Sequence, residues 1–184
     1  MRMKSLVLLM FVIFLMGGML GYLSAKVAPT GVAEGVMNTF GEKVKTIRFA
    51  PFSFWSVVLI FINNLTVALL MYILGITVVL PSLIVLLNGA VAGVVVAFAE
   101  NKGISSALAI LSMVPHGIFE LSAFFISASY GTMLGVMFWK RVLGKDGELR
   151  SLVAKMPFYV AFTIALLLLA AFIEAFISPL IFAI

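Results

Sequence analysis

Long uncharged stretches alternate with short polar ones along this chain. Residues 5–25, 52–74 and 77–98 contain no Asp, Glu, Lys or Arg. A helix rises about 1.5 Å per residue, so about 20 apolar residues cross a hydrocarbon core of about 30 Å. Each stretch therefore predicts one membrane-spanning helix. A cleaved signal peptide is the alternative for residues 5–25, and we expect the segment to be retained.

The uncharged run from residue 51 to residue 99 is about twice as long as one span requires. The chain must therefore turn back once within it. Gly75 and Pro81 mark the interval 75–82 as the position of that turn. The sequence thus predicts a tight hairpin that joins the second span to the third.

The stretch from residue 104 to residue 139 does not fit one simple span. It is too long for a single crossing and too short for two, and Pro115 interrupts it. We interpret residues 105–113 as a re-entrant, half-depth segment and residues 116–139 as the fourth span. Irregular backbone at membrane depth is tolerated where protein or water surrounds it. A single long, kinked helix that projects from the bilayer is the alternative.

Two further segments complete the predicted fold. Residues 157–181 form the fifth span, which begins at Pro157, a residue suited to the first turn of a helix. Residues 30–48 place apolar side chains three or four positions apart with charged ones between them, which is typical of an amphipathic helix. Because it lies between two apolar segments, we expect this helix to rest in the membrane interface.

Composition supports a membrane protein and excludes a soluble one. Hydrophobic residues make up 64% of the 184 residues and charged residues 10%, whereas soluble domains have about 45–50% and about 25%. No polar stretch is long enough to form a soluble domain, so residues 1–184 are predicted to form one all-α integral membrane domain. The absence of cysteine excludes disulfides and thiolate metal sites.

The net charge of +5 is consistent with membrane embedding. Lys and Arg stand beside the apolar segments, as in loops that face lipid headgroups, so we expect the bilayer as a partner and not nucleic acid. Five spans place the termini on opposite sides. A cytoplasmic amino terminus puts seven basic residues inside and five outside, which favours this orientation in the cell membrane, with an external carboxy terminus. The inner seven are Arg2, Lys4, Lys140, Arg141, Lys145, Arg150 and Lys155.

A few polar side chains stand inside the predicted spans, where they are costly to place in lipid. An ionisable group at the centre of a bilayer costs about 2.5–3.5 kcal/mol or more, so such groups face the helix bundle or water. They form the candidate binding site. Its members are Asn63, Asn64, Asn88, His116, Glu120 and Glu174.

His116 and Glu120 stand four residues apart, which places them one turn apart on one face of a helix. Glu174 is about 25 Å along a helix that starts at Pro157. It therefore falls in the same outer half of the bilayer as the His116–Glu120 pair. Since Asn63 and Asn88 fall near the middle of their spans, we expect four segments to converge on one polar site.

Three roles are open for His116, Glu120 and Glu174. The first is a satisfied polar network that fixes the register of the helices. The second is proton or ion handling. The third is a divalent metal site, since one His and two carboxylates are suitable ligands for zinc. The spacing matches no established zinc motif, and the sequence has no second histidine. The asparagines are expected to form hydrogen bonds between helices.

Glycines four residues apart predict close contacts between helices, because they let two backbones approach. A dimer face is a further interpretation of these pairs. The pairs are Gly17 with Gly21, Gly89 with Gly93, and Gly131 with Gly135.

The segment Pro115-His116-Gly117-Ile118-Phe119-Glu120-Leu121 resembles the signature of the stage II sporulation protein M family. Other segments resemble the remaining motifs of that family in the same order. They are Asn63-Asn64-Leu65, Asn88-Gly89 and Ile173-Glu174-Ala175-Phe176-Ile177-Ser178-Pro179. The resemblance implies a multi-span membrane protein. In spore-forming bacteria such a protein belongs to a complex with two cell-wall-cutting proteins and drives membrane engulfment.

The sequence leaves three functions open, in this order. The first is a non-enzymatic membrane scaffold or complex subunit, homo-oligomeric or bound to a membrane partner, whose polar site holds the helices together. The second is a small transporter or channel-like protein that moves an ion or a proton past the polar site. The third is an intramembrane metal-dependent hydrolase. No catalytic residue is assigned.

Overall fold

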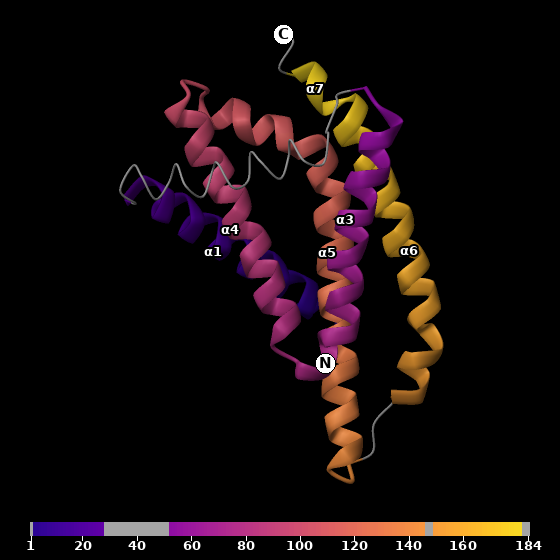
Figure 1. Ribbon diagram of the computed structural model, residues 1–184. Coiled ribbons are helices and arrows are strands. Elements are labelled where there is room, and N and C mark those ends of the chain that lie inside the picture. Colours follow the sequence, from indigo (N-terminus) through magenta and orange to yellow (C-terminus); the bar gives the residue numbers. More distant parts are fainter. Residues whose placement is uncertain (1, 28–51, 146–148, 182–184) are drawn as a thin grey trace.

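Five long helices make up the protein in a computed structural model that describes residues 2–27, 52–145 and 149–181 (Figure 1). Each of the five is long and apolar enough to cross a membrane. The predictions of an all-α protein and of five helices with the length and apolar composition of membrane spans are therefore confirmed, and the described ranges contain no strand. The predicted interfacial helix over 30–48 lies outside the described residues. The long helices are α1 (Met3–Val27), α3 (Phe54–Ile73), α4 (Leu80–Asn101), α5 (Ser106–Val142) and α6 (Leu149–Phe176).

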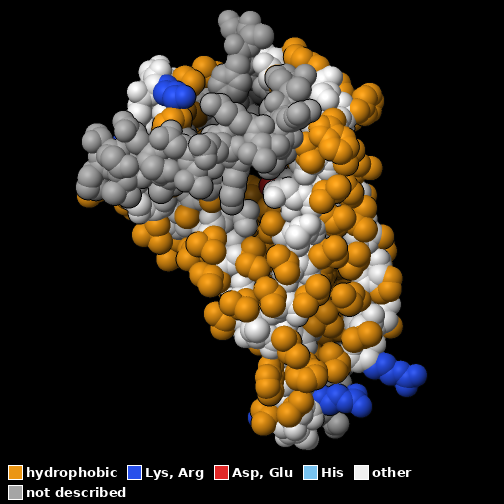
Figure 2. Space-filling view, in the orientation of Figure 1, with side chains coloured by type: hydrophobic (Ala, Val, Ile, Leu, Met, Phe, Trp, Pro, Cys, Tyr) orange, Lys and Arg blue, Asp and Glu red, His pale blue; other side chains and the backbone are white. Residues whose placement is uncertain are grey.

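The helices form two groups. Helices α3, α5 and α6 run side by side, whereas α1 and α4 cross them obliquely and pack chiefly on each other (Figure 1). The two groups meet in a buried core where the Phe125 ring lies edge-on to Phe11 and Phe14. On the face shown in Figure 2, hydrophobic side chains cover the flanks of the helices, as expected for surfaces in contact with lipid. The core residues are Met10, Ala68, Met71, Val85, Ala123, Phe124, Phe125, Ala128 and Leu167.

Glycines bring α1 and α4 into backbone contact. Gly89 faces the carbonyl of Phe14, and Gly93 faces that of Gly18, so the two helices run in the same direction. A Cβ atom would come within 2.2 Å of the first oxygen and 2.0 Å of the second. No larger residue fits at either position without separating the helices.

The turn between α3 and α4 falls within the predicted interval. A short 3-10 helix, η1 (Leu74–Thr77), ends α3, and α4 begins with Pro81 in its first turn. Val78 lies between them at φ +65°, and the Val79 N–H donates to the Thr77 carbonyl at 2.7 Å, which closes a γ-turn. The Thr77 hydroxyl accepts a hydrogen bond from the Leu80 N–H at 3.1 Å and so satisfies one of the free N–H groups in the first turn of α4.

Two helix boundaries differ from those expected. Residues 106–142 form one helix, so the predicted half-depth segment at 105–113 is the first part of α5 and is not a separate element. Figure 1 shows this part lying across the end of the bundle before α5 turns to run along α3 and α6. Pro115 lies inside this helix, and a proline lacks the N–H that would bond four residues back, so it can bend a helix without ending it. Similarly, α6 begins at Leu149, and Pro157 lies inside it and does not start it.

Candidate functional site

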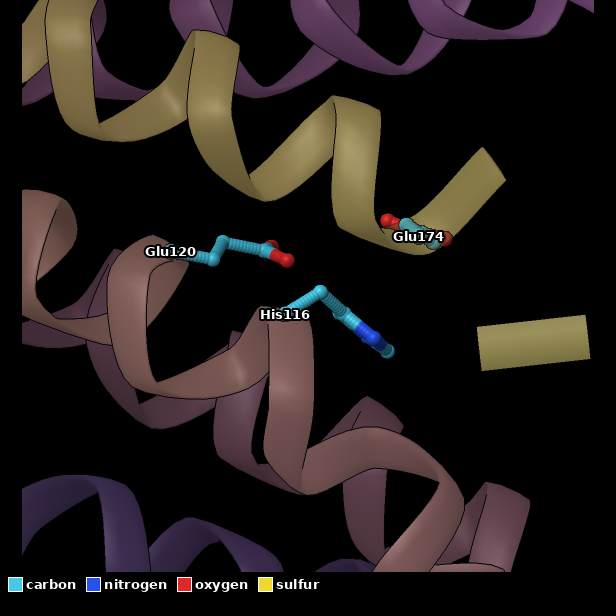
Figure 3. Close-up of side chains that lie close together, drawn as sticks. All are labelled: His116, Glu120 and Glu174. Atoms are coloured by element: carbon cyan, nitrogen blue, oxygen red, sulfur yellow. The ribbon is translucent and has the colours of Figure 1, made fainter. Parts of the chain in front are cut away.

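His116, Glu120 and Glu174 come together from two helices (Figure 3). His116 and Glu120 lie one turn apart on α5, and Glu174 lies in the last turn of α6. One nitrogen or oxygen atom from each side chain lies within 4.8 Å of the other two, and all three residues are half-buried. The cluster thus lies at the end of the bundle where α5 bends.

A hydrogen bond fixes the imidazole of His116. Its Nδ1 atom lies 2.9 Å from the hydroxyl of Ser178, a buried residue. Ser178 is the first residue of α7 (Ser178–Ile181), which is separated from α6 by one residue, Ile177. The site therefore links the bend of α5 to the carboxy-terminal helix.

The start of α3 also reaches this end of α6. The backbone N–H of Phe52 donates to the carbonyl of Ala175 at 3.0 Å, next to Glu174. That carbonyl belongs to the last turn of α6, where the helix itself supplies no donor. The rings of Phe52 and Phe54 pack edge-on against Phe176. Three parts of the chain therefore meet around the site.

Among the residues that the structure describes, the two carboxylates of the site have no counter-ion. Within residues 2–27, 52–145 and 149–181, neither Glu120 nor Glu174 forms a hydrogen bond or an ion pair. The one ion pair found in those ranges joins Lys26 to Glu100 at 2.8 Å. A charged carboxylate held away from water is stabilised only by a partner of opposite charge or by hydrogen bonds. The cluster can therefore hold protons or a cation.

The asparagines form hydrogen bonds within their own helices. The Asn63 amide donates to the Asn64 side-chain oxygen at 3.1 Å on α3, and the Asn88 amide donates to the Ile84 carbonyl at 2.8 Å on α4. Asn64 is buried and Asn63 is exposed. None of these bonds reaches the His–Glu cluster among the described residues, so a place for the asparagines in the site stays a prediction.

The glycine pair on α5, Gly131 with Gly135, packs on other parts of the same chain. A Cβ atom at Gly131 would come within 2.2 Å of the Met71 carbonyl, and one at Gly135 within 1.9 Å of the Gly75 carbonyl. These two glycines let the end of α3 and the following turn lie directly on α5. A dimer interface at the same positions would have to displace that contact.

Two polar groups were missed in the sequence. In the core, the Tyr72 hydroxyl lies 3.0 Å from that of Thr163, which lies 3.3 Å from Ser127. Neutral hydroxyl groups change the hydropathy of an uncharged stretch very little. The only sequence feature that could have found this group is the presence of a hydroxyl side chain in each of three predicted spans.

The second missed group surrounds Glu100 at the end of α4. Its carboxylate pairs with Lys26 and accepts hydrogen bonds from the hydroxyls of Tyr22, at 2.9 Å, and Ser106. The predicted third span ended at residue 98, before Glu100, and the partners of Glu100 lie on α1 and at the start of α5. This cluster ties three helices together at one end.

The family comparison gave a match over most of the chain. The model of the family described as Stage II sporulation protein M matches residues 10–179. The chain belongs to this family. For this family member, the match includes all three residues of the His–Glu cluster, Ser178 and both glycine pairs that pack on α1 and α3. Neither the comparison with curated proteins nor that with solved structures gave a match.

Proposed function

We propose that this stage II sporulation protein M family member is a non-enzymatic membrane scaffold, a subunit of a membrane complex. In this proposal the His116, Glu120 and Glu174 cluster holds α5 and α6 in place. The observation that carries it is the convergence of the three side chains within 4.8 Å, with His116 also bonded to Ser178. Polar contacts between helices fix their register in a lipid environment, where apolar packing alone discriminates weakly.

The location of the cluster supports a structural role. It lies where α5 bends, where α6 ends and where the backbone of Phe52 is bonded to Ala175. A change at the cluster therefore acts on three segments at once. Family membership adds support, because the resemblance implies a role within a membrane complex.

A small ion or proton transporter is the second candidate. The observation in its favour is the pair of carboxylates without a counter-ion among the described residues. Ionisable residues inside membrane spans commonly mark ion and proton pathways. In the transport candidate the cluster passes protons or ions across the membrane, whereas in the scaffold candidate it does not.

Flux through proteoliposomes separates them. We would reconstitute the protein and the Glu120→Gln/Glu174→Gln double variant at equal density, and follow proton, sodium and potassium movement with fluorescent indicators. The scaffold proposal expects both proteins to match empty vesicles. A flux in the parent protein that the double variant abolishes would overturn it in favour of transport. Helix content and monodispersity of both proteins serve as the control for folding.

A further inference from the structure

We infer that His116, Glu120 and Glu174 bind one divalent transition-metal ion, with zinc as the best match to the ligands. This inference rests on the proposed role of the cluster as the tie between α5 and α6, and it names the ligand of that cluster. It is carried by three observations: the donor atoms, the charge they bring and the hydrogen bond that orients the imidazole.

The donor atoms are close enough to share one ion. Ligand atoms of a tetrahedral zinc site lie about 3.3 Å apart, given bonds of about 2.0–2.1 Å. The three donor atoms here already lie within 4.8 Å of one another. Rotation about the side-chain bonds of the two glutamates has to close the remaining difference. Three protein ligands leave a fourth position for water.

The charge of the cluster matches a divalent ion. Glu120 and Glu174 supply two negative charges, a neutral imidazole supplies none, and an M²⁺ ion makes the site electrically neutral. A monovalent ion would leave one negative charge uncompensated beside lipid, which is costly. No Lys or Arg side chain in the described ranges pairs with either carboxylate, so none of those residues supplies a competing cation.

The hydrogen bond to Ser178 leaves the other ring nitrogen available. The Ser178 hydroxyl lies 2.9 Å from Nδ1 of His116. When Nδ1–H donates to that hydroxyl, Nε2 keeps the lone pair that a metal ion needs. Histidines that bind metals commonly form a hydrogen bond through the second nitrogen, and this bond fixes the ring orientation. Ser178 is therefore a positioning residue for the metal ligand.

The ligand types favour zinc over the hard cations. Mg²⁺ and Ca²⁺ prefer six or more oxygen ligands, whereas one nitrogen and two carboxylate oxygens suit Zn²⁺ and related transition ions. Mg²⁺ is thus the control cation in a binding test.

Metal content tests the inference directly. Detergent-purified protein is stripped with a chelator, incubated with Zn²⁺ or Mg²⁺, desalted and analysed by mass spectrometry for metals. We expect one Zn²⁺ per chain and no retained Mg²⁺. The His116→Ala, Glu120→Gln and Glu174→Gln variants should retain only background zinc. The Glu100→Gln variant, which alters a carboxylate paired with Lys26, should still retain one ion.

Two measurements cover the case in which a ligand variant fails to fold. Co²⁺ bound to the parent protein should give the visible absorption of a cobalt ion with low coordination number. Added Zn²⁺ should displace the Co²⁺ and remove that absorption. The Ser178→Ala variant retains all three ligands and should bind Zn²⁺ about 10–100-fold more weakly. Parent protein without zinc and without a cobalt spectrum would overturn the inference, as would zinc binding that persists in the Glu120→Gln/Glu174→Gln variant.

The outcome is separable from that of the scaffold proposal. If the parent protein binds no metal and shows no flux, the metal inference fails and the scaffold proposal stands. If zinc binds and flux through the cluster is also found, the inference stands and the scaffold proposal fails.

Discussion

Three glutamates of this protein differ in their surroundings, although all three lie on helices long enough to span a membrane. Glu100 has a lysine and two hydroxyls as partners, so its charge is satisfied within the protein. Glu120 and Glu174 face each other and His116 without such partners in the described ranges. The difference separates a carboxylate that ties helices together from a pair that needs a proton or an ion.

Ser178→Ala is the mildest change at the site. It removes the hydrogen bond to His116 and leaves the ring and both carboxylates in place. Loss of one buried hydrogen bond costs about 1 kcal/mol, or about 2–4 °C in the midpoint of thermal unfolding. The midpoint is measured by intrinsic fluorescence in one detergent.

Ser122→Ala is the matched control, because the Ser122 hydroxyl donates to the Ile118 carbonyl within α5. It should leave the midpoint nearly unchanged. Equal midpoints for Ser178→Ala and the parent protein would contradict a structural role for the contact.

At the scale of elements, an uncharged stretch predicts well that a span exists. It predicts less well at which residues the helix of that span begins and ends. A long apolar helix lies over each of the five predicted spans, because bilayer thickness sets a minimum apolar length that the sequence shows. One continuous helix through Pro115 was only the alternative interpretation, and the start of α6 before Pro157 was not predicted, because packing determines whether a proline bends a helix or ends it. His116 and Glu120 follow from their spacing, whereas Ser178 gave no comparable signal.

Two glycines on α5 offer a test of helix packing. Gly131→Ala places a Cβ atom within 2.2 Å of the Met71 carbonyl oxygen, so we expect the free energy of unfolding to fall by about 1–3 kcal/mol or more. Gly117→Ala meets no atom within 4 Å and should leave stability unchanged or raise it by up to about 1 kcal/mol. Thermal unfolding of both variants in the same detergent gives the comparison, and similar losses at both positions would argue against the observed packing.

At the scale of the whole molecule, basic residues gather where α5 ends and α6 begins. We call this the basic end, and its residues are Lys140, Arg141, Lys145, Arg150 and Lys155. The site and the basic end are about one hydrocarbon thickness apart. Along α5, the 20 residues from Glu120 to Lys140 correspond to about 30 Å, and along α6 the distance from Lys155 to Glu174 is about 28 Å. If the basic side chains mark one headgroup region, the cluster lies close to the opposite one. Water and ions from that side can then reach the cluster without crossing the hydrocarbon core.

The orientation of the chain can be measured directly, because the sequence has no cysteine. Ser151→Cys lies at the basic end and Ser105→Cys at the other, and both positions are exposed. With a cytoplasmic amino terminus, a membrane-impermeant maleimide should label Ser105→Cys in intact cells and Ser151→Cys only after permeabilisation. The cysteine-free parent protein controls for background, and the reverse pattern of labelling would invert the topology.

The contact between α1 and α4 has a consequence for biosynthesis. Helix α1 ends at Val27, and its glycine-matched partner is complete only at Asn101. At about 5–20 residues per second, a ribosome needs roughly 4 to 15 seconds to make the intervening chain. During that time α1 resides in the bilayer without its partner, and its exposed glycines are open to other helices. The first span is therefore inserted early and assembled late, whereas α5 and α6 can pair as soon as they leave the ribosome.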